Sequence, residues 1–388
     1  MPRTAWTARS AVALMAVATL AGCSSSTQSL TGPPAPAATA GGPLDLRGTC
    51  PGTVVVQEDW QPEAEYGGIY QLLGANRTID TSGKRVSGPL IAQGQDTGVQ
   101  VEIRTSPGTE PVASQMAVDP SITLGTVSSD QALVASAKQP VVTVVSTMTT
   151  SPQIIMWDPA SHPGATTIQQ AAASGVPVLT SGKVIPALLE AQRIMAPTQQ
   201  DTSYDGTPAR FVADPRILQQ GYATTEPYNY QHEIRQWSRP IAYQKLSDVG
   251  YNVYAEPLAV PAAHLAALRP CLSKLVPILQ RAQVDYVANP APTDALMVDL
   301  VNRYQAGWTY SSGTASYASQ QLKWGGYVAN DPSSGVFGRM DPGRWEQIVR
   351  TFGPLLQSTG ALPPGQLPAA ASLYSNEFID PNVHVLSP

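Results

Sequence analysis

Charged residues are scarce in this chain, and positive charge is scarcer than negative charge. Asp, Glu, Lys and Arg make up 13% of the 388 residues, about half of the roughly 25% that is typical of soluble domains. The 28 acidic residues outnumber the 23 Lys and Arg residues, which gives a net charge of −5. Because nucleic-acid-binding proteins carry a basic surface, we expect no nucleic-acid partner.

Several motifs of enzymes and metal sites are also missing. The chain has no G-x-x-x-x-G-K-[ST] phosphate loop, no G-x-G-x-x-G after a strand and no G-x-S-x-G turn. Its four histidines, at positions 162, 232, 264 and 384, form no H-x-x-x-H pair, so a zinc site is not expected. We therefore expect no metal and no cofactor, and no group of residues in the sequence indicates catalysis.

The first residues have the features of an export signal. Arg3 and Arg9 precede the apolar run 11–21, and Cys23 follows a Leu-Ala-Gly sequence. A positive start, a short apolar stretch and small residues before a cut predict a secretory signal peptide over residues 1–22. The apolar run is about half the roughly 20 residues that span a bilayer, which argues against a transmembrane anchor.

The end of this signal resembles the bacterial lipobox, in which the cysteine, here Cys23, is lipidated and becomes the mature N-terminus. The resemblance implies an extracytoplasmic protein anchored to the cell membrane by a lipid, and plain secretion is the alternative. Residues 23–49 are rich in Ser, Thr, Gly and Pro. This composition predicts a flexible tether between the lipid and a folded domain.

Two further cysteines remain in a chain that is predicted to be exported. Outside the cell, lone cysteines often pair, so we expect a disulfide between Cys50 and Cys271. The bond would join the start of the folded part to a predicted helix much later in the sequence. Two buried free thiols are the alternative.

Strand and helix patterns alternate along the chain, stop, and then alternate again. From Pro257 onward, helical spacing continues almost to the end. This order predicts an α/β protein with a mostly parallel sheet. We expect lobe one to comprise residues 50–148 plus 255–388, with lobe two, residues 149–254, inserted in it. Two connections between the lobes would form a hinge behind a ligand cleft.

Candidate ligand-binding residues follow the first predicted strand. In open α/β sheets, the carboxyl ends of the strands face the ligand crevice. Trp60 offers a flat apolar face for a ring, and Glu63, Glu65 and Tyr66 come soon after it. Carboxylates accept hydrogen bonds from amino groups. The alternative is that Trp60 belongs to the core and that the acids favour the N-terminus of the next helix.

Further candidates lie at other junctions of the predicted elements. Three of them join a strand to a helix, where they could bind a polar group or simply cap the helix. One lies where the chain leaves lobe one, and two lie in a Pro-containing loop of lobe two, for which a solvated turn is the alternative. These residues are Ser128, Ser129, Asp130, Thr147, Glu226 and Tyr228.

Together these segments resemble the extracytoplasmic substrate-binding proteins of ABC importers. The nearest group includes binders of thiamine-pyrimidine precursors, riboflavin, nitrate, sulfonates and taurine. The likeness covers roughly residues 52–380, but the polar segment 76–98 does not align and is a possible insertion in lobe one. The segments that carry the likeness are 59–62 with 67–70, 122–130, 220–228 and 375–378.

The resemblance implies a two-lobed, type II periplasmic-binding-protein-like fold. It further implies a monomer that captures a small solute without catalysing a reaction and delivers it to a membrane permease and its ATPase. The motifs are acidic and aromatic and contain no Arg, which suits a nitrogen heterocycle such as a thiamine precursor better than a bare anion. A secreted enzyme or ligand sensor that uses the same fold is the alternative.

Overall fold

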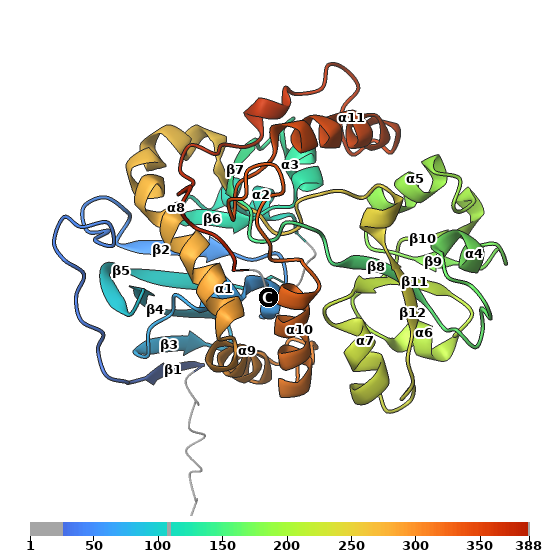
Figure 1. The fold of residues 1–388 in the computed structure, drawn as a ribbon, viewed down its shortest axis with the longest axis horizontal. Coiled ribbons are helices and arrows are strands. Elements are labelled where there is room, and N and C mark those ends of the chain that lie inside the picture. The colour runs from blue at the N-terminus through green and yellow to red at the C-terminus, as the bar shows by residue number, and fades with distance from the viewer. Residues whose placement is uncertain (1–25, 107–109, 387–388) are drawn as a thin grey trace, which may run out of the picture.

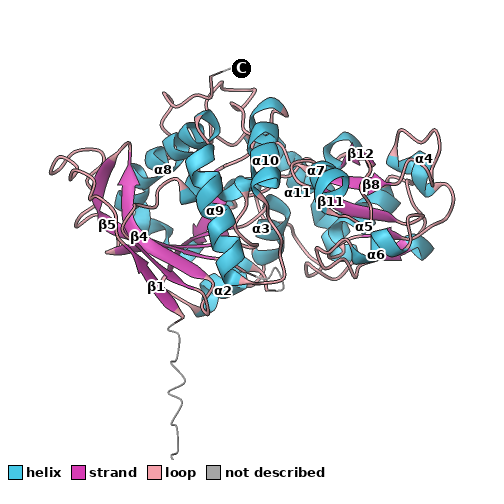
Figure 2. Ribbon diagram, turned by 90° about the horizontal axis from the view of Figure 1, so that it is seen from below, coloured by secondary structure: helices cyan, strands magenta, loops and turns pink. Residues whose placement is uncertain are grey.

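The structure is a computed structural model that describes residues 26–106 and 110–386, and within them the strands form two sheets (Figure 1). The larger sheet has the strand order β1-β3-β4-β5-β2-β6-β13-β7, and the smaller one has the order β10-β9-β11-β8-β12. We call the part around the larger sheet lobe one and the part around the smaller sheet lobe two. Figure 2 shows each sheet in its own body, with helices packed against it.

The strands of the larger sheet come from before and after the segment that forms the smaller sheet. They are β1 (Thr27–Leu30), β2 (Thr53–Gln57), β3 (Arg77–Asp80), β4 (Arg85–Ala92), β5 (Gln95–Arg104), β6 (Ile122–Thr126), β7 (Val141–Val145) and β13 (Leu258–Pro261). The strands of the smaller sheet all lie between β7 and β13 in the sequence. They are β8 (Gln153–Trp157), β9 (Val178–Leu179), β10 (Gln200–Asp201), β11 (Leu218–Tyr222) and β12 (Ala242–Lys245).

The helices are divided between the lobes in the same way. Those of lobe one are α1 (Gly67–Tyr70), α2 (Val112–Val118), α3 (Ser129–Ala135), α8 (Leu265–Ala288), α9 (Ala291–Tyr304), α10 (Ser312–Trp324) and α11 (Pro342–Ser358). Those of lobe two are α4 (Ile168–Ala172), α5 (Val184–Ala191), α6 (Ala209–Ala213) and α7 (Glu226–Tyr228). The second sheet thus falls inside the range 149–254, and the boundary residues themselves stay a prediction.

The central strand β2 is buried on both faces. Val54 and Val56 pack in the same hydrophobic cluster as Leu272 of α8. Val55 packs in a second cluster with Leu133 of α3. Because side chains alternate across a strand, a continuous apolar run of this kind is typical of a strand that helices cover on both sides.

The larger sheet is mixed, whereas the sequence predicted a mostly parallel one. β2 runs parallel to β5 and β6, but β13 pairs antiparallel with β6 and β7. Helical spacing was predicted here, yet Leu258, Ala259 and Val260 form the strand and are completely buried. A short apolar run does not distinguish a strand from a helix by its periodicity.

The unaligned segment 76–98 forms the hairpins of β3, β4 and β5 at one end of the larger sheet. Gln93 and Gly94 join β4 to β5, with φ angles of 49° and 75°. Two residues with positive φ angles suit the twist of a two-residue hairpin turn. The segment is therefore regular structure within lobe one.

The prediction of a flexible tether over residues 23–49 is wrong for the described residues from Thr27 onward. β1 pairs antiparallel with β3, and Leu46 is completely buried. The Lys274 ammonium of α8 donates to the carbonyl oxygens of Gly42 and Asp45, over 3.1 and 2.8 Å. Composition alone could not show contacts with residues so distant in the sequence. The predicted signal peptide and Cys23 lie outside the described residues.

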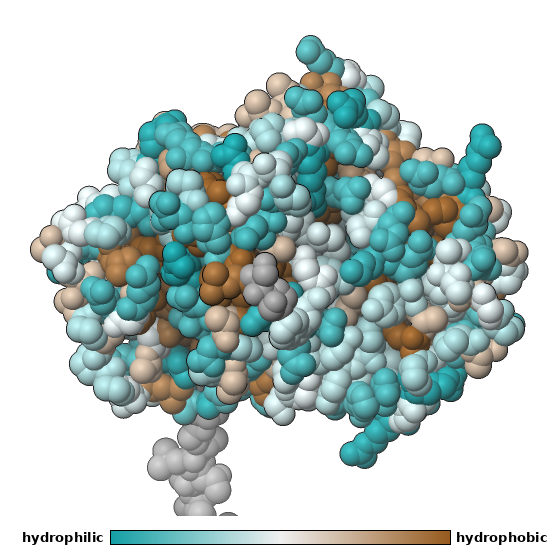
Figure 3. Space-filling model, in the orientation of Figure 1, coloured by the Kyte–Doolittle hydropathy of each residue, from teal (hydrophilic) through white to brown (hydrophobic). Residues whose placement is uncertain are grey.

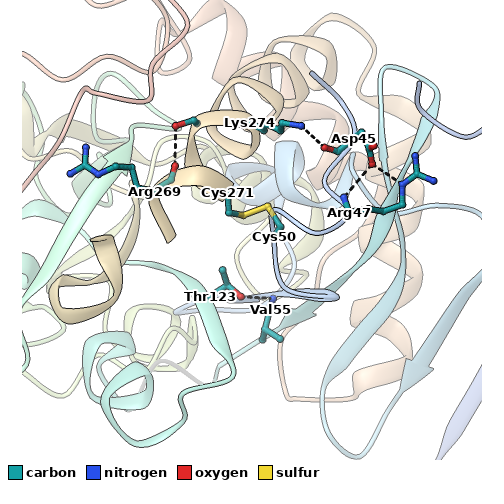
Figure 4. The surroundings of a disulfide bond; sticks show 9 residues. Asp45, Arg47, Cys50, Val55, Thr123, Arg269, Cys271 and Lys274 are labelled. Atoms are coloured by element: carbon teal, nitrogen blue, oxygen red, sulfur yellow. Dashed lines mark hydrogen bonds and ion pairs between the residues drawn. A yellow bond between two sulfur atoms is a disulfide. The ribbon is translucent and has the colours of Figure 1, made fainter. Parts of the chain in front are cut away.

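Cys50 and Cys271, the predicted pair, form a disulfide with their Cα atoms 4.6 Å apart. Figure 4 shows the bond running from the chain just before β2 to α8. Lys274, further along the same helix, points toward Asp45 in this view. Helix α8 therefore holds the N-terminal segment through both a covalent bond and hydrogen bonds.

One described segment, Ala262–Ala288, is long and apolar enough to cross a membrane by length and composition. It contains α8, which completely buries Leu272, Leu275 and Val276 and contacts α1 and β7. We therefore interpret it as a core helix of lobe one. In the view of Figure 3, apolar surface appears as scattered patches among hydrophilic residues.

We expect Gly67→Ala to lower the free energy of unfolding by about 1–3 kcal/mol, the usual cost of overpacking a core. A Cβ atom at Gly67 would lie 2.2 Å from the ring of Tyr286 in α8. That ring is held in place because its hydroxyl donates to Asp294 over 2.7 Å. Gly52→Ala is the matched control, since a Cβ atom there meets nothing within 4 Å. Urea denaturation measures both, and equal stabilities would contradict the close packing of α1 on α8.

Candidate functional site

Five carboxylate side chains gather where lobe one meets lobe two, and we call them the acidic cluster. They are Asp59, Glu63, Glu65, Glu226 and Glu256. Glu65, Glu256 and Glu63 are only 1%, 4% and 8% exposed. Glu63 and Glu256 lie close enough to other members that the charges of those members raise the pKa of both.

The lobe-one members of the acidic cluster are placed by the carboxyl ends of β2 and β6. The Asp59 backbone N–H donates to the Thr126 hydroxyl over 3.0 Å, and that hydroxyl donates to the Asp59 carboxylate over 2.7 Å. The Tyr66 hydroxyl donates to the same carboxylate over 2.8 Å. Glu65 lies in the short 3₁₀ helix Ala64–Tyr66, directly before α1.

Lobe two contributes Glu226, the first residue of α7. Its carboxylate accepts a hydrogen bond from the Tyr222 backbone N–H over 2.6 Å. The side chain lies against Gly221 of β11, where a Cβ atom would come within 2.8 Å of it. The Thr224 hydroxyl, in the same turn, donates to the Glu65 carboxylate of lobe one. This hydrogen bond links the two lobes at the acidic cluster.

Other contacts also join the lobes on the cleft side. The Thr314 hydroxyl of α10 donates to the Asn229 side chain over 2.6 Å, and the Ser311 hydroxyl donates to Glu233 over 2.6 Å. The Trp60 ring lies so close to Gly206 of lobe two that a Cβ atom there would be 3.0 Å away. The structure is therefore a closed arrangement of the two lobes.

A cavity of about 250 Å³ remains between the lobes. Its walls combine aromatic rings with two carboxylates, Glu226 and Glu233, and the described lining contains no Lys, Arg or His. The aromatic residues of the lining are Tyr204, Tyr230 and Trp308. Trp60 packs edge-on against Trp308, with ring centroids 5.7 Å apart.

A second, larger cavity of about 410 Å³ lies at the two connections between the lobes. Arg344 of α11 lines it, and its guanidinium donates to the carbonyl oxygens of Thr149, Asn252 and Val253 over 2.5, 3.1 and 2.7 Å. These carbonyls belong to both connections. Arg344 thus connects the two segments that join the lobes. We take the smaller cavity as the candidate functional site, because Glu226 of the acidic cluster lines it.

Burial raises the pKa of four members of the acidic cluster. The pKa of Glu226 is raised to about 7. Burial raises the pKa of Glu63 and Glu256 well above the usual value, and neighbouring carboxylates add to both effects. Burial also raises the pKa of Glu65, although the Thr224 hydrogen bond opposes this. Among the described residues, no Lys, Arg or His forms an ion pair with these four side chains.

The ligand-free protein should lose stability as the pH rises from about 4.5 to 7. The folded pKa of Glu226 is about 7, above the usual 4.5 of a glutamate side chain, so in this range the folded state binds the proton more tightly than the unfolded state. One pKa unit corresponds to about 1.4 kcal/mol, so Glu226 should contribute up to about 3 kcal/mol to this loss. Urea denaturation at a series of pH values measures it. Glu226→Gln should flatten the profile, and an unchanged slope would contradict the raised pKa.

The structure brings several predicted ligand residues to the cleft. Trp60, Glu63, Glu65 and Glu226 lie in or beside the acidic cluster, as described above. Tyr66 is buried, and its hydroxyl is occupied by Asp59. These positions are compatible with the predicted role in binding, which stays a prediction.

The ring of Tyr228, another predicted ligand residue, lies between the lobes. Its centroid is 5.6 Å from that of Tyr317 in α10 and 4.7 Å from that of His232. Tyr228 therefore contacts lobe one at the cleft.

The remaining predicted residues form hydrogen bonds at the hinge. Ser128 donates to Asp130 over 2.7 Å, and Asp130 accepts from the Tyr251 hydroxyl over 2.9 Å. The Ser129 hydroxyl accepts from the Tyr254 backbone N–H over 3.0 Å. Thr147 donates to the carbonyl oxygen of Glu256 over 2.5 Å. These four side chains link the first connection between the lobes and the start of α3 to the second connection between the lobes.

Sequence reasoning did not single out several residues of the site. Glu256 lies on the connection that returns from lobe two, where no motif marks it. Asp59 lies in the segment 59–62 but is not among the predicted ligand residues, and neither Trp308 nor Tyr204 is among them. These residues share one feature in the sequence: each is an acidic or aromatic residue between two predicted elements. Such residues are too common to identify a site.

Comparisons with known proteins establish the fold. No protein-family model and no curated protein matches the chain. The ligand-binding component of an ABC-type import system from Staphylococcus aureus, solved with zinc bound, is similar over 84% of this chain and 97% of its own, with 12% identity and a TM-score of 0.51. The alkanesulfonate-binding protein SsuA from Xanthomonas axonopodis pv. citri, bound to MOPS, is similar over 84% and 99%, with 10% identity and a TM-score of 0.52.

The periplasmic aliphatic sulphonate-binding protein SsuA from Escherichia coli is similar over 83% of this chain and 92% of its own, with 13% identity and a TM-score of 0.51. These likenesses confirm the predicted two-lobed, periplasmic-binding-protein-like α/β fold. At such low identity they do not identify the solute, because the fold is compatible with many functions.

Proposed function

We propose that this chain is the solute-binding component of an ABC importer and delivers a small solute to a membrane permease and its ATPase. The observation that carries the proposal is the cavity between two lobes that close on each other around the acidic cluster. The hydrogen bond between Thr224 of lobe two and Glu65 of lobe one can form only when the two lobes meet, so it belongs to the closed form. A solute that contacts both lobes favours closure, and a permease can distinguish the closed form from the open one.

For the solute, we propose a nitrogen heterocycle such as a thiamine precursor. Trp60 would contact the ring, and Glu63, Glu65 and Glu226 would accept hydrogen bonds from its N–H groups. Two features support this assignment: the described lining of the cavity offers acceptors without an Arg or Lys, and it is rich in aromatic rings.

We further propose that the mature protein is a monomer held at the membrane by a lipid on Cys23. Only three residues separate Cys23 from Thr27, where β1 begins. Full extension of so short a segment spans on the order of 10 Å. Lobe one would therefore stay next to the membrane surface, which raises its effective concentration for a permease.

Cross-linking in intact cells tests this function. Cross-linked material that is purified through this chain should contain an ABC permease subunit, identified by mass spectrometry. Cys23→Ala, which removes the lipid acceptor, should reduce that cross-link strongly while leaving the fold unchanged. If the permease is not recovered with the unmodified chain, the proposal is wrong.

An enzyme is the second candidate, and one observation favours it. Carboxyl groups with raised pKa values in a cleft are typical of catalytic acids and bases, and Glu63, Glu226 and Glu256 have them. A co-purified solute that is recovered chemically changed after incubation with the protein would support this candidate. Recovery of the same molecule supports binding without catalysis.

A further inference from the structure

Around the cleft, the described residues bring together many carboxyl groups and no Lys, Arg or His that pairs with them. The members of the acidic cluster come from both lobes, and Glu58, which is completely buried, lies directly beside them. None of these carboxylates has an ion-pair partner among the described residues. Burying an ionised carboxylate without a partner is costly, so a positive group of a solute would offset a cost that no described side chain offsets.

Individual oxygen atoms of this group also lack partners. Glu65 Oε2 and Glu256 Oε2 are buried and accept no hydrogen bond. The side chains to which they belong are 1% and 4% exposed. Buried polar atoms in native proteins usually have partners. A solute that donates hydrogen bonds would supply the partners that the protein does not.

Aromatic rings form the other part of the walls. Tyr204, Tyr230 and Trp308 line the cavity together with Glu226, and Trp60 packs against Trp308. The faces of such rings attract cations. The described residues contain no group of three or more His, Cys, Asp or Glu side chains arranged to hold a metal ion, which favours an organic cation over a metal.

We propose that the solute is a small organic cation with N–H donors that occupies the cavity lined by Glu226 and Trp308. It would reach past them to Glu65 and Trp60, which adjoin these two residues. This inference rests on the proposed function and specifies the charge of its solute. The cavity of about 250 Å³ lies below the roughly 300–1,000 Å³ of sites for drug-sized ligands. The cation is therefore small.

Binding of such a cation should release protons. Glu226 faces the carboxylates of Glu63 and Glu65 from lobe one and the hydroxyls of Tyr204 and Tyr230 from lobe two. When the carboxyl group is protonated, it is neutral and attracts a cation only weakly. If one carboxyl group must lose its proton before the cation binds, the affinity for the cation rises up to tenfold for each unit by which the pH increases. This holds as long as the pH is below the pKa of that carboxyl group.

Three flat probes of similar size and different charge test the inference. They are benzamidinium, which is a cation with N–H donors, benzamide, which is neutral, and benzoate, which is an anion. We include 4-aminopyridinium as a second cation. Isothermal titration of the mature protein with each probe, at pH 6, 7 and 8, gives the dissociation constants. Both cations stay protonated in this range, so a change in affinity reports on the protein.

A cation should bind at least tenfold more tightly than benzamide and benzoate, and its affinity should increase from pH 6 to pH 7. Glu226→Gln should remove most of this increase. Glu346→Gln is the matched control, because Glu346 is an exposed carboxylate of α11 whose side chain is 64% exposed. It should leave both the affinity and its pH dependence unchanged.

Preferential binding of benzoate or benzamide, or binding by neither cation, overturns the inference. The proposed function is tested separately by the permease cross-link. A recovered permease together with a preference for an anion would leave the importer role standing and remove only the charge assignment.

Discussion

Glu65→Gln should weaken cation binding by about 30-fold to more than 1,000-fold. Removing one partner of a buried, hydrogen-bonded charge pair costs about 2–5 kcal/mol, and 1.4 kcal/mol corresponds to tenfold. Glu65 is 1% exposed, and one of its oxygens has no partner in the protein. The substitution keeps the shape and the acceptor that Thr224 uses, but it removes the negative charge. Titration with benzamidinium at pH 8 measures the loss.

The same substitution should have the opposite effect on stability. Without a solute, the buried Glu65 side chain must either take up a proton or carry an unpaired charge at pH 8, and both cost stability. Glu65→Gln should therefore raise the melting temperature of the ligand-free protein at pH 8. Such opposed effects on binding and stability are typical of functional sites. Glu346→Gln again serves as the control. Reduced binding together with reduced stability would indicate instead that Glu65 mainly holds the lobes together.

Removal of the disulfide should cost about 2–5 kcal/mol in the free energy of unfolding. The bond joins residues 221 positions apart, so it strongly restricts the unfolded chain. The double variant Cys50→Ala, Cys271→Ala avoids an unpaired thiol. Urea denaturation measures the loss, and Cys23→Ala is the control, because it removes a cysteine outside the disulfide. A loss below about 1 kcal/mol would show that α8 holds the N-terminal segment without the covalent bond.

Much of the fold could be predicted from local patterns. The apolar run of β2 predicted the first strand, and the helical spacing late in the sequence predicted helices there, because burial on both faces of a strand or along one stripe of a helix leaves a clear signal. The two-lobed order followed from a strand and helix alternation that stops and restarts. The N-terminal segment did not follow from its composition, because Leu46 and Lys274 hold it through contacts between distant positions.

The site was predictable only where polar or aromatic residues follow a clear strand. Trp60, Glu63 and Glu65 come after β2 and were predicted in this way, and their role in binding stays a prediction. Glu256 was missed because the connection that leads from lobe two back to lobe one has no periodicity. Its place in the acidic cluster depends on how the two connections between the lobes lie against each other. The residues around Ser129 were predicted for the cleft, but they form hydrogen bonds at the hinge. The sequence shows that both regions are junctions and does not show which junction faces the solute.

Native mass spectrometry of the protein purified from its own cells tests the central claim most directly. The mature chain should carry one small molecule, and that molecule should be an organic cation with N–H donors. Glu65→Gln protein prepared in the same way should carry much less of it. A sulfonate or another anion in the cleft would contradict the cation assignment, and protein that never carries a small molecule would contradict solute binding itself.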